Sequence, residues 1–319
     1  MNTFKFAIMG AGNVSHRFYQ AVKSMTTCEV AAVASKSLEK ANMFAQEHDG
    51  IAAYDSYEEM LQKEMPDAVY IGTVPSFHYD LIMLCLDYRI PVLCEKAMFL
   101  NKAEAETVFE RARQEHIFVM EGMWSRFLPA VCQAKQWLED GRIGEVRFLE
   151  TAIGFSAPKE AENRYYNRSL GGGTRYDILV YAHELTTFML EKPVQDVQVQ
   201  TIWGETGVDI TTHVSLKYAD AIASLTTSFE TPLREFMTIY GEHGVIEVIQ
   251  PHMAKTAILY DRNRKEIARY QDETGMDGFV YQIQEVIDCV HAGKCESDVV
   301  PHQCTLDSAE LFDLVEQTR

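Results

Sequence analysis

The 319-residue sequence lacks any long uncharged apolar run, although apolar residues make up 47% of it. A membrane-crossing helix needs about 18 or more such residues in succession, so none is expected. The first residues also lack the basic flank, the apolar core and the small-residue cleavage site of a signal peptide. We therefore expect a globular protein that is cytoplasmic and makes no membrane contact.

Basic residues are scarce. Lys and Arg total 29 against 47 Asp and Glu, which gives a net charge of −18. A surface this acidic repels phosphate backbones, so we expect no nucleic-acid partner. The total charge does not oppose an anionic cofactor, because a local site can be positive on an acidic protein.

The cysteines contain no C-x-x-C pair, and their number, seven, is odd. This usage is typical of reduced structural thiols in a cytosolic protein. We also expect no metal, because several histidines show no metal-ligand spacing. These histidines are His78, His183, His213, His243 and His252.

The first third of the chain alternates short apolar strands with helical segments. This rhythm predicts βαβ units and a parallel sheet, that is, an α/β fold with an N-terminal Rossmann dinucleotide-binding domain over residues 1–123. The expected strands cover residues 5–9, 29–34, 68–73, 91–94 and 117–120.

After residue 124 the strands become longer and alternate apolar with polar residues. This pattern predicts a C-terminal α+β domain over residues 124–319 with a large, mostly antiparallel open sheet. Its closing helix could pack back on the first domain. The expected strands cover residues 146–155, 196–203, 211–218, 221–229, 236–240 and 256–260.

A glycine-rich loop over residues 10–15 follows the first strand and opens a helix. Gly10 permits a tight turn, and Gly12 lets the backbone approach a pyrophosphate at the helix N-terminus, next to Asn13 and Val14. Ser15 replaces the usual third Gly or Ala and is small enough for the same close packing. We expect a dinucleotide site here; the alternative is a plain strand–turn–helix junction.

The second strand ends in Ser35, Lys36 and Ser37, with no Asp or Glu among them. An acidic residue at this point would hydrogen-bond the ribose hydroxyls of NAD. A cation between two hydroxyls suits a 2′-phosphate instead, which favours NADP(H) over NAD(H). The alternative is that Lys36 is a solvated residue at a helix start.

Two further segments carry proton-handling groups. Lys96 lies just past a buried strand, where ligands bind in open α/β sheets; its alternative is a surface ion pair with Glu95. Asp177 and Tyr181 follow three glycines and are four residues apart, so they share one face of a helix. A carboxylate and a phenol so placed resemble an acid–base pair. We interpret His183 as a packed or rim histidine.

Together these motifs resemble the Gfo/Idh/MocA oxidoreductases over essentially the whole chain. The most specific segment, residues 121–130, is similar to the branch of dimeric dihydrodiol dehydrogenases and NADP-dependent D-xylose 1-dehydrogenases. Two departures stand out, Ala97 for a usual proline and Leu179 for a usual glycine. The matching segments are residues 10–15, 73–78, 95–97, 121–130 and 172–181.

The resemblance implies that Lys96, Asp177 and Tyr181 hold the catalytic positions. It also implies a homodimer formed through the open sheet. Residues Trp124 and Arg126 are expected to shape the cofactor–substrate crevice, with interdomain packing as the alternative. The other expected cofactor-side residues are Thr73, Pro75, His78, Glu95 and Lys96.

The sequence thus predicts an NADP-dependent dehydrogenase or reductase. It would transfer a hydride between nicotinamide and a carbinol or carbonyl carbon of a sugar, polyol or cyclic diol, with Tyr181 as acid/base. The alternative is a non-catalytic NADP-binding sensor or regulator on the same fold. A third hypothesis is hydride transfer to a non-sugar ligand such as a linear tetrapyrrole or an imine.

Overall fold

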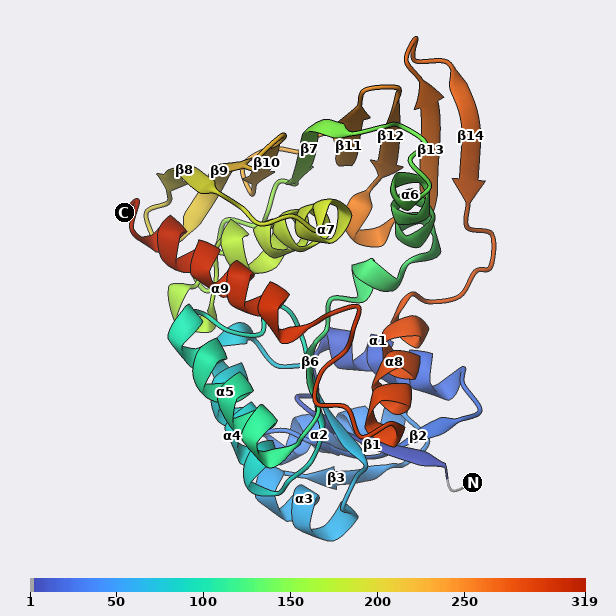
Figure 1. The fold of residues 1–319 in the computed structure, drawn as a ribbon. Coiled ribbons are helices and arrows are strands. Elements are labelled where there is room, and N and C mark those ends of the chain that lie inside the picture. Colours follow the sequence, from blue (N-terminus) through green and yellow to red (C-terminus); the bar gives the residue numbers. More distant parts are fainter. Residues whose placement is uncertain (1–2) are drawn as a thin grey trace. The chain divides into compact units, whose positions relative to one another are not determined.

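The computed structural model describes residues 3–319, which form two compact units (Figure 1). The first unit combines Met1–Gly122 with Phe279–Leu306, and the second combines Met123–Gly278 with Asp307–Arg319. The sequence predicted one boundary near residue 123 and a contiguous second domain. In the structure, residues 279–306 belong to the first unit instead.

Helix α8 (Phe279–His291) explains this return of the chain. The Arg17 guanidinium lies 4.2 Å from the centroid of the Phe279 ring, at the start of the helix. At its other end the His291 ring meets the Phe4 ring edge-on at 5.6 Å. The apolar face of α8 is therefore buried against the first unit, which periodicity along the chain does not reveal.

The first unit contains a six-stranded sheet in the order β3-β2-β1-β4-β5-β6, with parallel pairing throughout. This is the strand order of a Rossmann fold and confirms that prediction. The strands β4 and β5 are wholly buried, as short apolar runs in a doubly covered sheet must be. The strands are β1 (Phe4–Met9), β2 (Cys28–Ala34), β3 (Ala52–Tyr54), β4 (Ala68–Ile71), β5 (Val92–Cys94) and β6 (Val119–Glu121).

Side-chain caps set where several helices of this unit begin. Ser37, Ser56 and Asn101 each accept a hydrogen bond from the backbone N–H three residues further on. Helix α1 is an exception, because its N-cap, Gly12, has no side chain to offer. Besides α8, the helices are α1 (Asn13–Lys23), α2 (Leu38–Glu47), α3 (Tyr57–Glu64), α4 (His78–Asp87) and α5 (Lys102–Glu115).

The second unit contains an eight-stranded sheet in the order β14-β13-β12-β11-β7-β10-β9-β8. All its pairs are antiparallel except that of β7 with β10, which confirms the mostly antiparallel sheet. The strands are β7 (Val146–Gly154), β8 (Asp196–Trp203), β9 (Asp209–Lys217), β10 (Ile222–Ser228), β11 (Phe236–Gly241), β12 (Gly244–Ile249), β13 (Thr256–Asp261) and β14 (Glu266–Gln271).

One face of this sheet is covered by helices α6 (Pro129–Glu139) and α7 (Val180–Leu190), which lie on the same side of it in Figure 1. The Thr151 hydroxyl of β7 lies 3.5 Å from the Thr186 hydroxyl of α7, so Thr151 points to the covered face. The neighbouring residues Phe148 and Glu150 of β7 are half-exposed and flank Leu149, which is buried. The opposite face therefore carries them.

The remaining elements are short turns and the closing helix α9 (His302–Glu316), which the division into units cuts at Leu306. Among residues 3–319 no helix combines the length and the apolar character needed to cross a membrane. The short elements are η1 (Pro75–Phe77), η2 (Trp124–Phe127), η3 (Arg168–Leu170), the π-helix η4 (Arg175–Leu179) and η5 (Pro251–Met253).

Candidate active site

The glycine-rich loop of the first unit has the geometry of a phosphate cradle. Gly10 has φ 101°, and a Cβ there would lie 2.9 Å from the Thr73 side chain, so glycine is required. At Gly12 the first turn of α1 has neither a side-chain cap nor an acidic residue. The N–H groups of that turn thus have no capping side chain and no negative neighbour, which suits a bound anion. These residues fit a dinucleotide pyrophosphate.

Ser15, the departure at the third position of the loop, stabilises the turn itself. Its hydroxyl donates a 2.6 Å hydrogen bond to the carbonyl oxygen of Gly10. A Cβ on Gly72, which follows β4, would lie only 2.3 Å from the Ser15 oxygen. The serine thus closes the packing between the loop and β4, the role that the sequence assigned to a small residue here.

The three residues after β2 have different contacts. The Ser37 hydroxyl oxygen is the N-cap of α2 and accepts from the Lys40 N–H. The Lys36 ammonium lies 4.2 Å from the centroid of the Phe77 ring, a cation–π contact that the sequence did not predict. Ser35 is nearly buried. The Ser35 hydroxyl oxygen accepts a 3.4 Å hydrogen bond from the Ser37 N–H, and Lys36 is exposed near the carboxyl end of β2.

His78 links the end of β4 to the segment that carries Lys96. Its two ring nitrogens lie 3.0 Å from the Ala97 carbonyl oxygen and 3.1 Å from that of Thr73. Burial lowers the pKa of His78 to about 4, so the ring is neutral and donates to one of the two carbonyls. These contacts make His78 a positioning residue; the prediction that it touches the cofactor stays a prediction.

Lys96 lies between two well-fixed neighbours. Glu95 is buried and accepts a 2.7 Å hydrogen bond from the Tyr70 hydroxyl. Burial raises the pKa of Glu95, and the Tyr70 hydrogen bond lowers it in part. On the other side, the peptide bond between Lys96 and Ala97 is cis. Lys96 itself is half-buried, at the carboxyl end of β5 where the sequence placed it.

Tyr181, on the first turn of α7 in the second unit, has a defined hydrogen bond. Its side chain is 7% exposed, and the Trp124 indole N–H donates to the phenolic oxygen at 2.8 Å. The His252 ring lies beside the phenol, 5.6 Å between centroids. Because indole is only a donor, the phenol oxygen is the acceptor in this hydrogen bond.

Asp177 lies in a π-helical turn, Arg175–Leu179, where the sequence predicted α-helix. Its carboxylate accepts a 3.2 Å hydrogen bond from the Arg164 guanidinium. The turn is held at its start by Asp209 of β9, which accepts from the Arg175 N–H at 2.7 Å. Such wider turns are frequent at functional sites. Leu179, which stands where the resembled family usually has glycine, is completely buried.

Arg126 is engaged in a buried network within the second unit. Its guanidinium forms a 2.8 Å ion pair with Glu184, whose carboxylate also accepts from the Ser308 hydroxyl at 2.6 Å. His183 shares that hydroxyl at 2.8 Å, and burial lowers its pKa to about 4. His183 is thus confirmed as a packed histidine. The prediction that Arg126 also contacts the cofactor stays a prediction.

Two known protein families match this chain, one in each unit. Residues 4–123 match the family described as "Oxidoreductase family, NAD-binding Rossmann fold". Residues 131–247 match the family described as "GFO/IDH/MocA C-terminal domain". The chain therefore belongs to the Gfo/Idh/MocA oxidoreductases, as the motifs predicted.

Curated relatives match at nearly full length. The trans-1,2-dihydrobenzene-1,2-diol dehydrogenase of Danio rerio is 32% identical, over 99% of this chain and 96% of that protein. The human protein of the same name is 30% identical with the same two coverages.

Solved structures share the fold at lower identity. The aldose-aldose oxidoreductase of Caulobacter crescentus, complexed with glycerol, has a TM-score of 0.89 at 19% identity, over 99% of this chain and 97% of that one. A 3-ketoreductase from Actinomadura kijaniata in complex with NADP and TDP-benzene has a TM-score of 0.87 at 21% identity, over 99% and 98% of the two chains.

Proposed function

We propose that this protein is an NADP-dependent dehydrogenase or reductase that interconverts a carbinol and a carbonyl carbon. The observation that carries the proposal is the buried Tyr181 phenol, whose oxygen is held by the hydrogen bond from the Trp124 indole N–H. When bound, the nicotinamide supplies the hydride acceptor or donor at its C4 atom. The experiment that tests this is turnover of wild type and Tyr181→Phe, described in the Discussion.

Tyr181 acts as the acid/base. In the oxidative direction the Tyr181 phenolate would take the proton of the substrate hydroxyl, and the carbinol hydrogen would pass as hydride to the nicotinamide. In the reductive direction the phenol would give that proton to the carbonyl oxygen. Lys96 binds the same substrate oxygen through its ammonium and stabilises negative charge that develops on it. Asp177, oriented by Arg164, accepts a hydrogen bond from a neighbouring substrate hydroxyl.

Trp124 positions Tyr181 in this scheme. We expect Trp124→Phe to lower kcat by about five- to tenfold, because one net hydrogen bond is worth about 1 kcal/mol. Steady-state kinetics check this, with the NADPH dissociation constant measured beside it. A changed dissociation constant would show that Trp124 also contacts the cofactor, as the sequence predicts. A kcat equal to that of wild type would show that Trp124 does not position Tyr181 for catalysis.

Cofactor preference rests on Ser35 and Lys36. We expect Ser35→Asp to shift the ratio of kcat/KM for NADP+ over NAD+ at least about tenfold towards NAD+, since a carboxylate repels a 2′-phosphate and accepts from ribose hydroxyls. Ser24→Asp, a serine at the end of α1, serves as the matched control. An unchanged ratio would show that Ser35 does not determine the preference between NADP+ and NAD+.

The substrate class follows from the relatives and from the site. Proteins similar to this chain are named for a dihydrobenzene diol and for aldoses. Asp177 and Arg164 offer an acceptor and a donor next to the glycine turn, which suits vicinal hydroxyl groups. We therefore take the substrate to be a small polyhydroxylated molecule: a sugar, a polyol or a cyclic diol.

A homodimer through the open face of the eight-stranded sheet is part of the proposal. That face carries half-exposed Phe148 and Tyr240 side by side, 5.8 Å between ring centroids. We expect wild type to sediment at twice 36.3 kDa. Phe148→Asp, which places like charges across a two-fold axis, should shift it to the monomer. Sedimentation unaffected by Phe148→Asp would locate the interface elsewhere.

The cytoplasm is the compartment that we propose. All seven cysteines are free, and burial raises the pKa of the Cys85 and Cys94 thiols. Such thiols behave as small hydrophobic core residues. Seven cysteines that form no disulfide with one another are typical of a reducing compartment.

A further inference from the structure

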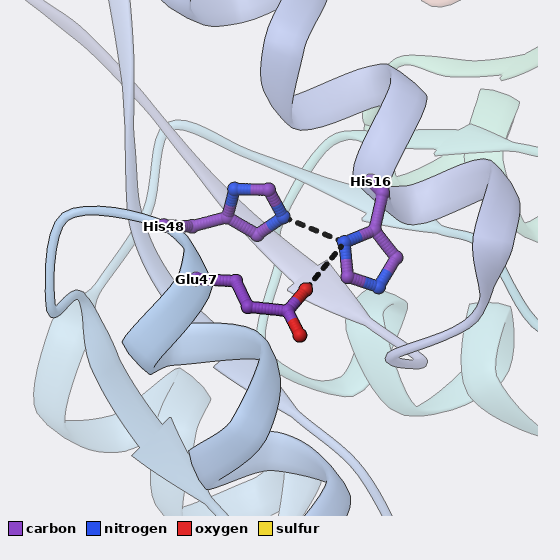
Figure 2. A group of neighbouring side chains, drawn as sticks. All are labelled: His16, Glu47 and His48. Atoms are coloured by element: carbon purple, nitrogen blue, oxygen red, sulfur yellow. Dashed lines mark hydrogen bonds and ion pairs between the residues drawn. The ribbon is translucent and has the colours of Figure 1, made fainter.

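Two histidines and a glutamate converge in the first unit, outside the residues discussed so far (Figure 2). His16 lies on the first turn of α1, Glu47 is the last residue of α2, and His48 caps the end of α2. His16 Nδ1 lies 2.7 Å from His48 Nε2 and 3.6 Å from a carboxylate oxygen of Glu47. The three candidate ligand atoms all lie within 4.8 Å of one another.

A single N–H satisfies only the contact between the two rings, because the Glu47 oxygen, 3.6 Å from the His16 nitrogen, lies beyond hydrogen-bond distance. Two ring nitrogens 2.7 Å apart need a proton between them, because two lone pairs at that distance repel. The Glu47 carboxylate then faces the same His16 nitrogen with its own lone pairs, and one N–H points at only one acceptor. A divalent cation placed among the three atoms would accept an electron pair from each of them.

We propose that His16, Glu47 and His48 form a binding site for a divalent transition-metal ion of the zinc class. Two imidazoles and a carboxylate are a zinc donor set that leaves a fourth position to water, whereas Mg²⁺ prefers oxygen ligands alone. At zinc–ligand distances of about 2.0–2.1 Å, tetrahedral ligand atoms lie about 3.3 Å apart. The 3.6 Å between Glu47 and His16 is close to this spacing, and the two imidazoles, 2.7 Å apart, must separate by about half an ångström.

Aromatic neighbours hold the two imidazole rings, and the exposed side chains can still make the small movement that a bound ion requires. His48 is 4% exposed and lies against Tyr19 and Phe44, with ring centroids 4.1 and 4.4 Å away. Phe44 also packs against the His16 ring at 4.5 Å. The His16 and Glu47 side chains are 35% and 62% exposed, so they can adjust and an ion can enter. A bound ion would tie the start of α1 to the end of α2.

The test is a titration of chelator-stripped full-length protein with Zn²⁺ against a chromophoric chelator. Exposed Cys132 is replaced by serine in every sample, because a thiolate would bind Zn²⁺ by itself. His16→Gln and Glu47→Gln are compared with Glu39→Gln, which makes the same charge change in the first turn of the same helix. Thermal melting with and without Zn²⁺ is recorded for each sample, and shows whether each variant folds.

We expect one Zn²⁺ per chain, with affinity at least about tenfold lower in His16→Gln and Glu47→Gln and unchanged in Glu39→Gln. Zn²⁺ should raise the melting temperature of the parent and not of His16→Gln, and excess Mg²⁺ should not displace it. Absence of stoichiometric Zn²⁺ binding, or equal affinity in all variants, would overturn the proposal. None of these readouts uses turnover, so the outcome is independent of the proposed function.

Discussion

Replacing Tyr181 with phenylalanine is expected to lower kcat by about 10²–10⁴-fold, the range for loss of a general acid/base. The change removes one oxygen and keeps the ring, so the packing of the phenol against His252 is retained. We expect the NADPH dissociation constant to stay nearly unchanged, because the phosphate cradle lies in the first unit and Tyr181 in the second.

Tyr176→Phe is the matched control for this variant. Tyr176 lies one turn earlier, is 8% exposed where Tyr181 is 7%, and packs edge-on against Phe312 at 5.1 Å. Burial raises the pKa of Tyr176 to about 12, which makes it a poor proton carrier near neutral pH. Turnover should therefore survive in Tyr176→Phe. Equal losses in both variants would indicate damage to the helix and contradict the assignment of Tyr181.

The second large effect is expected for Lys96→Met, which should lower kcat/KM by about 10²–10³-fold, as loss of one charge-stabilising donor does. Methionine keeps the length of the side chain and removes the ammonium. Since His78 fixes the neighbouring Ala97 carbonyl, the backbone at this position should hold. Rapid kinetics with saturating NADP+ separate binding from hydride transfer.

Lys63→Met provides the comparison for Lys96→Met. Lys63 pairs with Glu59 on the surface of α3, and an exposed pair of this kind contributes at most about 1 kcal/mol. Kinetics of Lys63→Met should match wild type. If Lys96→Met also retains near-normal kcat/KM, then Lys96 does not bind the reacting oxygen and our account of charge stabilisation is wrong.

The parts of the fold and site that depend on neighbouring residues were predictable. The turn at Gly10 follows from local chain chemistry, because only glycine tolerates its positive φ and close packing. Alternation along β7–β10 likewise predicted a sheet with one covered face. Three strands were missed: β3 has only three residues, β12 is a short run buried except at Ile249, and β14 is a mostly exposed edge strand, so none shows a long alternation of apolar and polar residues.

Contacts between residues that are far apart in the chain could not be predicted from the sequence. Trp124 donates to Tyr181 across 57 positions, and His16 meets His48 across 32. Spacing along the chain cannot detect such pairs. The π-helical turn at Asp177 depends in the same way on Asp209, a residue of a later strand.

The most direct test of the account is reduction of NADP+, followed by absorbance, against a panel of aldoses, polyols and cyclic trans-diols. Wild type and Tyr181→Phe are run side by side. We predict turnover of at least one compound by wild type and its loss in Tyr181→Phe. NADP+ binding without turnover of any compound in either direction would contradict the enzyme and favour a non-catalytic NADP-binding sensor.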